Sequence, residues 1–405
     1  MFIKNYLFLV KIIFLFPIIL IFLIFRIFLN IRIGMIETSS FGHMLIPIEI
    51  FLCEKKDKKL ENTDLVLWFC ENPAKLDMRV KTLNTYILEK WRKNLLILPR
   101  HLLEPLYILF YKFKSTRKFV YIVKEKNPIG KVSFLPGKKI DEYNLLKKYE
   151  PFIKFSKKEE NLATEILTKY SLNKNDRIVC FAGRSQFYKN EKLSARNSNV
   201  LNQIDGMKFL IDNGYKAVRL GKDEEVQLPQ IHDNLIDFSF SRDRSDFLDL
   251  YLVSICEFFV SPASGINEMA TIMRKKKLLI DFSHFENLYK QNLSFIPIIL
   301  PKKIFSKKQN KIIPYSKFFE FKFEQINDFN KLEEGGYQLI DNTSDEIRYA
   351  INNMSRLVKN KINFEQKKIR QQKFWDNFEK FYAFSPKNTI ICPTFFDNNE
   401  DYLIN

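Results

Sequence analysis

Short apolar runs alternate with longer amphipathic stretches along most of this 405-residue chain. Runs such as RIVCFAG and YKAVRLG have the length of buried strands, whereas SNVLNQIDGMKFLIDNG repeats its apolar residues with the period of a helix. Such alternation is typical of a parallel sheet covered by helices. Because it starts at IRIGMIE and starts again at RIVCFAG, the sequence predicts two α/β, Rossmann-like halves.

Helix boundaries in the second half follow from small and polar residues. Gly214 is expected to end the helix that begins near Ser198, and Ser245 is expected to cap the start of the helix in SDFLDLYLVSIC. The stretch INEMATIMRKK reads as another helix, and DNTSDEIRYAINNM reads as a terminal helix with Asp or Ser at its N-cap.

An apolar segment covers residues 7 to 29 and is interrupted only by Lys11, Pro17 and Arg26. About 20 apolar residues suffice to cross a bilayer, and no small-residue cleavage site of a signal peptide follows. We expect residues 1 to 30 to form a membrane-anchor helix; the alternative is a helix lying in the membrane interface. The 5 cysteines show no CxxC spacing and read as free thiols, which favours the cytoplasmic face of the membrane.

The chain is basic, with 65 Lys and Arg against 47 Asp and Glu, a formal net charge of +18. This charge attracts anions such as phosphorylated small molecules or an acidic membrane surface. Nucleic acid is not expected as a partner, because no aromatic and basic motif of RNA-binding type is present. The 4 histidines show no metal-ligand spacing such as HExxH, so no metal site is predicted.

The stretch VSPASGINEMA joins a predicted buried strand, which ends at Ser261, to the helix that follows. Such a turn lies at the carboxyl end of a parallel sheet, where open α/β folds bind ligands. There Ser264 and Gly265 would let the backbone approach a phosphate at the start of the helix. The alternative is that Ser264 only caps this helix.

Other strand ends of the second half carry cations and glycines beside this turn. Gly183 and Arg184 follow the first strand, Arg219 and Gly221 follow the second, and Arg196 and Asn197 precede the helix between them. Each arginine alone reads as a solvated surface charge, but together they predict a site for a diphosphate. Neither GxGxxG nor GxxxxGK[ST] occurs, so the sequence supports neither an NAD fingerprint nor an NTPase phosphate loop.

Four blocks of the sequence resemble a family of bacterial glycosyltransferases found with surface-polysaccharide genes: RIGMIETSSFGHMLIPIEIFL, GRSQFYKN, ARNSNVLNQIDGMKFLIDNGYKAVRLG and DFLDLYLVSICEFFVSPASGINEMA. The resemblance covers roughly residues 31 to 350. It implies the glycosyltransferase B (GT-B) architecture, with a nucleotide-sugar donor and a glycan or lipid-linked acceptor. Arg184 also resembles an arginine of fucosyltransferase-like enzymes, although GRSQFY departs from their HxRxxD pattern.

The resemblance divides the chain into a membrane anchor (1–30), an acceptor domain (31–165), a nucleotide-sugar donor domain (166–345) and a C-terminal helical segment and tail (346–405). His43, at the start of a helix in the first half, is the candidate base that would deprotonate an acceptor hydroxyl, with a capping or packing role as the alternative. Glu49 is a weaker candidate. Glu268 would contact the ribose or the sugar, or cap its own helix.

The sequence therefore predicts a membrane-associated glycosyltransferase in surface-polysaccharide synthesis, with a nucleotide sugar as substrate and neither a bound metal nor a tightly bound cofactor. Arginines would stabilise the leaving diphosphate. The first alternative is a noncatalytic membrane-tethered protein that binds nucleotides or an anionic polymer. A nucleotide-sugar epimerase ranks lower, because His232 and His284 do not fall at suitable positions.

Overall fold

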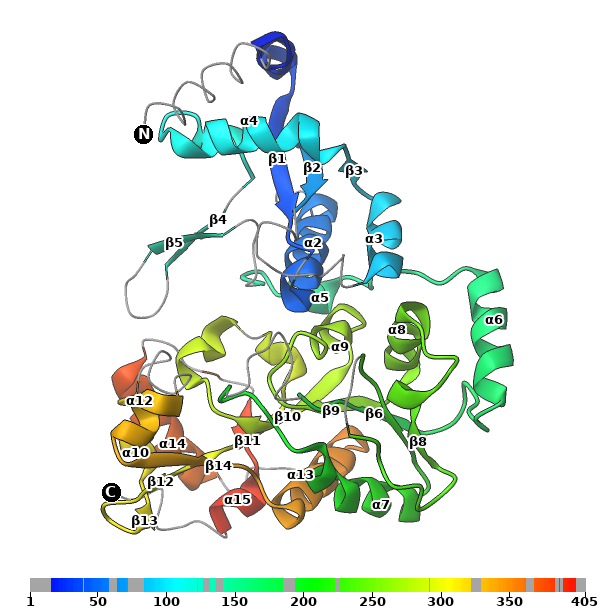
Figure 1. The fold of residues 1–405 in the computed structure, drawn as a ribbon, viewed down its shortest axis with the longest axis vertical. Helices are drawn as coiled ribbons and strands as arrows, with labels where there is room; N and C mark the ends of the chain where they lie inside the picture. The colour runs from blue at the N-terminus through cyan, green and yellow to red at the C-terminus, as the bar shows by residue number, and fades with distance from the viewer. Residues whose placement is uncertain are drawn as a thin grey trace. The chain divides into compact units, whose positions relative to one another are not determined.

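The computed structural model describes residues 16–38, 40–57, 64–71, 84–121, 123–126, 132–135, 141–184, 194–222, 226–290, 292–321, 329–361, 368–382, 386 and 389–397. The chain divides into two compact units (Figure 1). Unit 1 comprises Met1–Asn127 and Lys131–Leu145, and unit 2 comprises Pro128–Gly130 and Leu146–Asn405.

Unit 1 is built on a three-stranded parallel sheet in the order β1-β2-β3. The middle of β1 fits its neighbour closely, because a Cβ atom on Gly34 would lie 2.7 Å from the ring of Trp68 on β2. A separate antiparallel pair, β4 and β5, belongs to the same unit. The elements are β1 (Asn30–Ile36), α2 (Phe41–Lys56), β2 (Asp64–Cys70), α3 (Thr85–Arg92), β3 (Leu96–Ile97), α4 (Arg100–Lys112), β4 (Val123–Lys126), β5 (Val132–Leu135) and, at the border, α5 (Leu145–Lys148).

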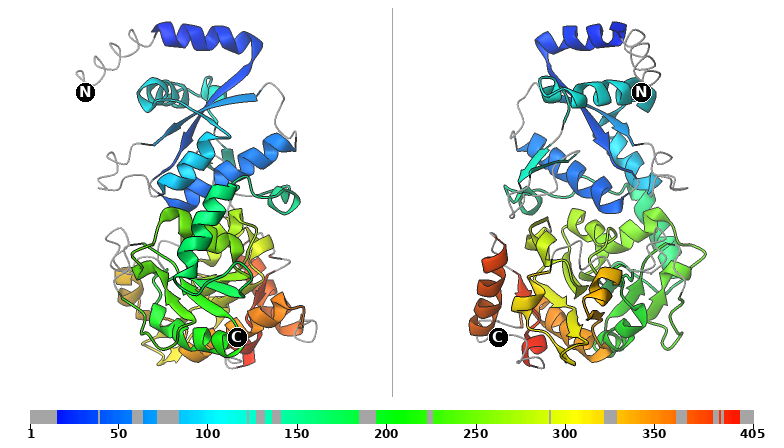
Figure 2. Two further views of the ribbon diagram at one scale, coloured as in Figure 1. Left: turned by 90° about the vertical axis from the view of Figure 1, so that its right-hand side faces the viewer. Right: turned by 60° about the vertical axis from the view of Figure 1, so that its left-hand side comes forward.

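Residues 16 to 28 are helical and lie beside α4 in both views of Figure 2. Phe22 is buried there, with its ring centroid 5.2 Å from that of Phe110 on α4. No helix within the described residues combines the length and the apolar character that crossing a membrane requires. The first half of the predicted anchor lies outside the described residues, and the anchor as a whole stays a prediction.

Unit 2 contains a seven-stranded parallel sheet in the order β15-β11-β10-β9-β6-β7-β8. From β6 the chain builds outward through β7 to β8, and then returns to place β9 on the other side of β6. This is a doubly wound topology, as the alternating pattern predicts. The strands are β6 (Ile178–Phe181), β7 (Lys216–Arg219), β8 (Leu235–Asp237), β9 (Phe258–Ser261), β10 (Lys276–Phe282), β11 (Ile298–Pro301) and β15 (Ile390–Ile391).

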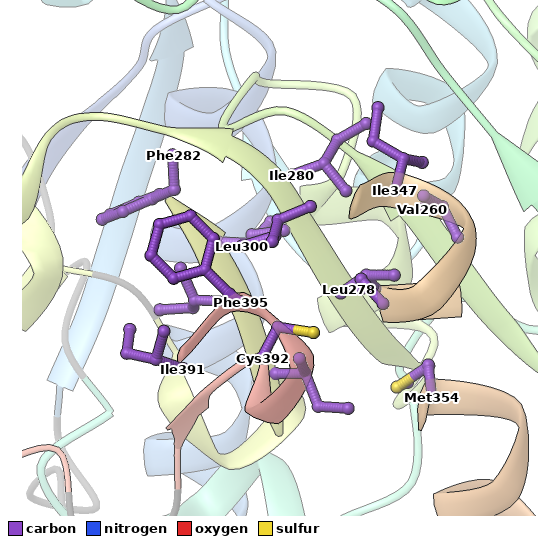
Figure 3. Packing of buried hydrophobic residues seen from close by; sticks show 14 of the residues in the cluster. Val260, Leu278, Ile280, Phe282, Leu300, Ile347, Met354, Ile391, Cys392 and Phe395 are labelled. Carbon is purple, nitrogen blue, oxygen red and sulfur yellow. The ribbon is translucent and has the colours of Figure 1, made fainter. Parts of the chain in front are cut away.

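Helices cover both faces of this sheet, with α8 and α9 on one face and α7 and α13 on the other (Figure 1). Figure 3 shows how Val260 and Leu278 of the sheet pack together with Ile347 and Met354 of α13. The strands are apolar on both sides because helices bury both sides. These helices are α7 (Ile204–Asp212), α8 (Asp246–Ile255), α9 (Glu268–Ile272) and α13 (Ser344–Val358).

The remaining elements of unit 2 flank this sheet. A small antiparallel sheet has the order β13-β12-β14. The segment after residue 345 is part of unit 2, because α13 packs on α7 and β15 extends the large sheet. The flanking elements are α6 (Lys157–Thr168), β12 (Lys303–Ser306), β13 (Lys311–Ile312), α10 (Tyr315–Phe318), α12 (Phe329–Glu334), β14 (Tyr337–Ile340), α14 (Lys368–Phe381) and α15 (Pro393–Asp397).

Two predicted helix boundaries are confirmed and two are wrong. Gly214 follows α7 with a φ of 77°, and Ser245 caps α8 by accepting a hydrogen bond from the Leu248 N–H. The terminal helix α13 is capped by Thr343, neither Asp nor Ser, in a reciprocal capping box with Glu346. The helix predicted from INEMATIMRKK covers only Glu268–Ile272, and Arg274 has a left-handed φ of 60° just beyond it.

Candidate functional site

The sheet of unit 2 reverses its direction of winding between β6 and β9. At the carboxyl end of these adjacent strands, the Ala182 N–H donates to the Val260 carbonyl at 3.0 Å. In doubly wound sheets, ligands bind outside the carboxyl ends of the strands at such a switch point. The structure therefore places Gly183 and Arg184, after β6, next to the turn that follows Ser261 of β9.

The segment before α7 folds back over the end of β6. The Ser198 N–H donates to the Arg184 carbonyl at 3.3 Å, and a Cβ atom on Gly183 would lie 3.3 Å from Val200. This fold-back brings Arg196 and Asn197 to the strand end that carries Arg184, whose residue exposure is 6%. The rest of GRSQFYKN, residues 185 to 190, lies outside the described residues, as do residues 191 to 193.

A buried carboxylate that the sequence analysis did not single out holds this segment in place. Asp281 of β10 accepts hydrogen bonds from the Ser198 hydroxyl at 2.6 Å and from the Asn342 N–H at 2.7 Å. Burial raises the pKa of Asp281 to about 6, although Lys302 opposes the shift. Lys302 also donates to the Asn197 carbonyl at 2.7 Å, so two buried charged groups fix the fold-back.

A buried lysine on the neighbouring strand β10 holds the turn after β9 in place. Lys277 of β10 lies 3.3 Å from the Glu268 carboxylate and donates to the Asn267 side-chain oxygen at 3.3 Å. Asn267 in turn donates to the Pro262 carbonyl at 3.2 Å, which closes the turn. The desolvation of Lys277 lowers its pKa, and Glu268 opposes that shift. Glu268 therefore has an internal partner, and its predicted contact with the ribose or sugar stays a prediction.

The expected role of Ser264 as a helix cap does not match the structure. The residue at the N-cap of α9 is Asn267, and its side chain does not cap the helix. With only five residues, α9 also offers less of a helix dipole than the sequence suggests. Ser264 and Gly265 are thus loop residues. A contact with an anion would come from the Ser264 hydroxyl and the backbone of this loop, and not from the dipole of α9.

Several buried side-chain oxygens near the switch point lack a partner. Among the described residues, no hydrogen-bond partner is found for four of them: Asn197 Oδ1, Gln203 Oε1, Ser261 Oγ and Ser264 Oγ. Gln203 reaches the same strand end, because its amide nitrogen donates to the Ala182 carbonyl at 3.2 Å. Buried polar atoms are nearly always satisfied in folded proteins, so this concentration of exceptions calls for a ligand or for water.

Arg219 does not join this group. It lies opposite Asp237 in the register of β7 and β8, with its Nη1 atom 3.2 Å from the carboxylate, and its exposure is 1%. The same Nη1 atom also donates to the Val226 carbonyl, so a phosphate that bound it would have to compete with both of these internal partners. Gly221, which follows it with a φ of 150°, lies at the end of β7, away from the switch point.

His43 belongs to unit 1, in the first turn of α2. Its Nδ1 atom lies 2.6 Å from the Oε2 atom of Glu37, which follows β1. The sequence analysis missed Glu37, although its position directly after a strand is the signal that identified Arg184. Glu49, the weaker candidate, lies fully buried in the same helix.

Within the described parts of the chain, no group of three or more His, Cys, Asp or Glu residues has an arrangement that would hold a metal ion. The cysteines are free thiols, and burial raises the pKa of Cys180 well above its usual value. A neutral, buried thiol is a poor nucleophile.

No family model matches the sequence, and no curated protein matches it significantly. Solved structures that the chain is similar to include three glycosyltransferases. The glycosyl transferase family 9 protein of Veillonella parvula is 11% identical, over 62% of this chain and 80% of its own, with a TM-score of 0.35. The ADP-heptose lps heptosyltransferase II of E. coli is 11% identical, over 61% of this chain and 84% of its own, with a TM-score of 0.34.

The third is the dodecameric iron-containing heptosyltransferase TibC in complex with ADP-D-beta-D-heptose. It is 12% identical, over 82% of this chain and 78% of its own, with a TM-score of 0.39. At these identities and TM-scores, the activity of this chain has to be argued from its own residues.

Proposed function

We propose that this protein is a glycosyltransferase of GT-B architecture that takes a sugar from a nucleotide-diphosphate sugar. One observation carries the proposal: oxygens of Gln203, Ser261 and Ser264 that are buried, and have no partner in the described part of the chain, gather at the switch point of the sheet in unit 2, where Arg184 and Arg196 also lie. A nucleotide sugar presents both a diphosphate and many hydroxyls, which is the combination that arginines and side-chain oxygens recognise.

The chemistry assigns a role to each group. The oxygen of an acceptor hydroxyl attacks the anomeric carbon, the bond from that carbon to the diphosphate breaks, and the nucleoside diphosphate leaves with the electron pair. Arg184 and Arg196 stabilise the charge that develops on the leaving diphosphate. His43 takes the proton of the acceptor hydroxyl. The acceptor that fits a surface-polysaccharide enzyme is a glycan or a lipid-linked sugar.

We further propose that the protein acts at a membrane, with its catalytic units on the cytoplasmic side. Supporting this, residues such as Ile27 and Phe28 on the N-terminal helix are largely exposed, and the net charge is +18. Large exposed apolar surface beside cations suits an anionic bilayer.

The test is thermal unfolding of the detergent-solubilised full chain with UDP-, GDP-, ADP- and CMP-sugars. We expect one nucleotide class to stabilise the wild-type chain by about 2.7 kcal/mol at a ligand concentration 100 times Kd. Arg184→Ala should weaken that binding by about 10- to 100-fold, because a charge-assisted hydrogen bond is lost. Ser264→Ala should weaken it less.

The matched control is Arg348→Ala, which removes an arginine paired with Asp345 on the surface of α13. It should leave nucleotide binding unchanged. Binding to Arg184→Ala equal to the wild type would refute the site. Binding without transfer to any glycan or lipid-linked acceptor would favour the noncatalytic nucleotide-binding protein.

A further inference from the structure

The carboxyl end of β1 carries a carboxylate that lies within hydrogen-bond distance of the candidate base. Glu37 directly follows the strand, and His43 lies in the first turn of α2. The His43 Nδ1 atom and the Glu37 Oε2 atom are 2.6 Å apart, with side-chain exposures of 36% and 22%. The pair is thus partly exposed, as a group that meets a substrate has to be.

Both members of the pair are held by packed elements. The strand β1 pairs with β2 in parallel register up to Ile36, directly before Glu37. The helix α2 is buried from Met44 to Glu54, and the Met44 N–H donates to the Ser40 carbonyl at 2.9 Å. A short hydrogen bond between two rigid elements fixes the orientation of the imidazole ring.

A second polar group lies beside the pair. Thr38 is fully buried, and its hydroxyl has no hydrogen-bond partner among the described residues. Buried hydroxyls without a partner are rare, and each calls for an explanation such as a bound ligand or water. Thr38 and the Glu37–His43 pair therefore mark the end of β1 as a place where a polar molecule binds.

We infer that Glu37 is a positioning residue that orients the His43 ring and selects its tautomer. A carboxylate only accepts hydrogen bonds, whereas a neutral imidazole carries one N–H and one accepting nitrogen. Glu37 therefore places the proton on Nδ1, and the proton acceptor of the ring is Nε2. This inference rests on the proposed function, in which His43 takes a proton from an acceptor hydroxyl.

The proton balance follows from this arrangement. The acceptor hydroxyl gives its proton to His43 Nε2 as its oxygen bonds to the anomeric carbon, and the imidazolium that forms stays beside the Glu37 carboxylate. Glu37 itself neither gains nor loses a proton. Replacing Glu37 by Gln leaves the shape but replaces an acceptor-only group by an amide, which can offer either its N–H or its carbonyl oxygen to Nδ1, so a proton on Nδ1 is no longer enforced.

The experiment combines ring-nitrogen NMR of ¹⁵N-histidine-labelled full chain with kinetics. The His43 signals are assigned by their loss in His43→Ala. In the wild type near neutral pH we expect a protonated Nδ1, and in Glu37→Gln a mixture or the opposite tautomer. With the sugar donor and acceptor in hand, Glu37→Gln should lower kcat on the order of 10²-fold, with little change in KM for the sugar donor.

The matched control is Glu89→Gln on α3, a carboxylate whose side chain is 70% exposed and paired with Arg92. It should change neither the tautomer nor kcat. Thermal unfolding of each variant shows that it is folded. A wild-type His43 protonated on Nε2, or a tautomer that Glu37→Gln leaves unchanged, would overturn the inference. A chain that shows the expected tautomers but transfers no sugar would refute the proposed function and not the pairing of Glu37 with His43.

Discussion

Asp281, together with Lys302, ties the fold-back segment to the rest of unit 2. Its carboxylate accepts hydrogen bonds from Ser198 and from the Asn342 N–H, and its own N–H donates to the Asn342 side chain at 2.7 Å. These contacts join residues far apart in the sequence at the end of β10. The arginines expected to bind phosphate depend on this scaffold for their position.

The raised pKa of Asp281 makes a pH-dependent prediction. Its pKa is about 6 in the folded chain against 3.8 for an ordinary Asp, so the folded state binds more protons between these values. The unfolding free energy therefore falls as the pH rises through this range, and this loss is complete above about pH 7. A shift of two units corresponds to roughly 3 kcal/mol.

Chemical unfolding at pH 4, 5, 6 and 7 measures this effect. Because an amide does not titrate, Asp281→Asn should lose the corresponding part of the pH dependence. Asp345→Asn, at a surface carboxylate with 74% side-chain exposure, should follow the wild type. Parallel curves for the wild type and Asp281→Asn would show that folding does not raise the pKa of Asp281.

At the scale of elements, the close approach of α7 and α13 builds the face of the sheet opposite α8 and α9. A Cβ atom on Gly206 of α7 would lie 2.3 Å from the Cδ1 atom of Ile351 on α13, which is fully buried. Glycine is thus required by packing, although it is a poor helix former. The contact holds α7 in place behind the fold-back segment.

This contact predicts a compensating pair of substitutions. In an open helix, Gly→Ala stabilises by about 1 kcal/mol, but in Gly206→Ala the new methyl group meets Ile351, and we expect a net loss of roughly 1 to 3 kcal/mol. Ile351→Val removes the Cδ1 atom and costs about 1 kcal/mol alone.

The double variant should be more stable than the sum of the two single effects implies, with a coupling of about 1 kcal/mol or more in a double-mutant cycle. Lys208→Ala, on the exposed side of the same helix, is the control for helix propensity. Strict additivity would show that α7 and α13 move apart to accept the methyl group.

At the scale of the whole molecule, two α/β units and an apolar N-terminal helix share one basic chain. Ile27 and Phe28 have exposures of 76% and 75%, whereas Phe22 on the same helix packs against α4. One face of this helix packs within unit 1, and Ile27 and Phe28 are exposed to solvent. The membrane proposal rests on these side chains.

Flotation of the full chain with phosphatidylglycerol-containing vesicles tests it. We expect the wild type to float with the vesicles, and Ile27→Glu combined with Phe28→Glu to weaken membrane binding by about 100-fold or more, because two apolar side chains that enter the bilayer contribute at least ~3 kcal/mol. Ile369→Glu, at an α14 side chain with 74% exposure, should float like the wild type. Equal flotation of all three chains would show that this face does not meet the bilayer.

The sequence by itself determined the parts of the fold that depend on near neighbours. Apolar periodicity predicted the doubly wound sheet of unit 2, and short-range capping chemistry predicted Gly214 and Ser245, because a helix end is decided by residues within one turn. The strand ends also follow from local pattern, which is why Arg184 and Ser264 were found. The tertiary structure decided which of those side chains remain available.

Arg219 and Asp237 are paired only because the register of β7 and β8 places them opposite each other, and Lys277 reaches Glu268 only because β10 lies beneath the turn after β9. Likewise, Glu37 and His43 meet through the packing of β1 against α2. Charged groups on different elements pair through strand order, register and packing, which no local pattern contains. The order of the strands therefore decided the site, after the sequence had determined the strands themselves.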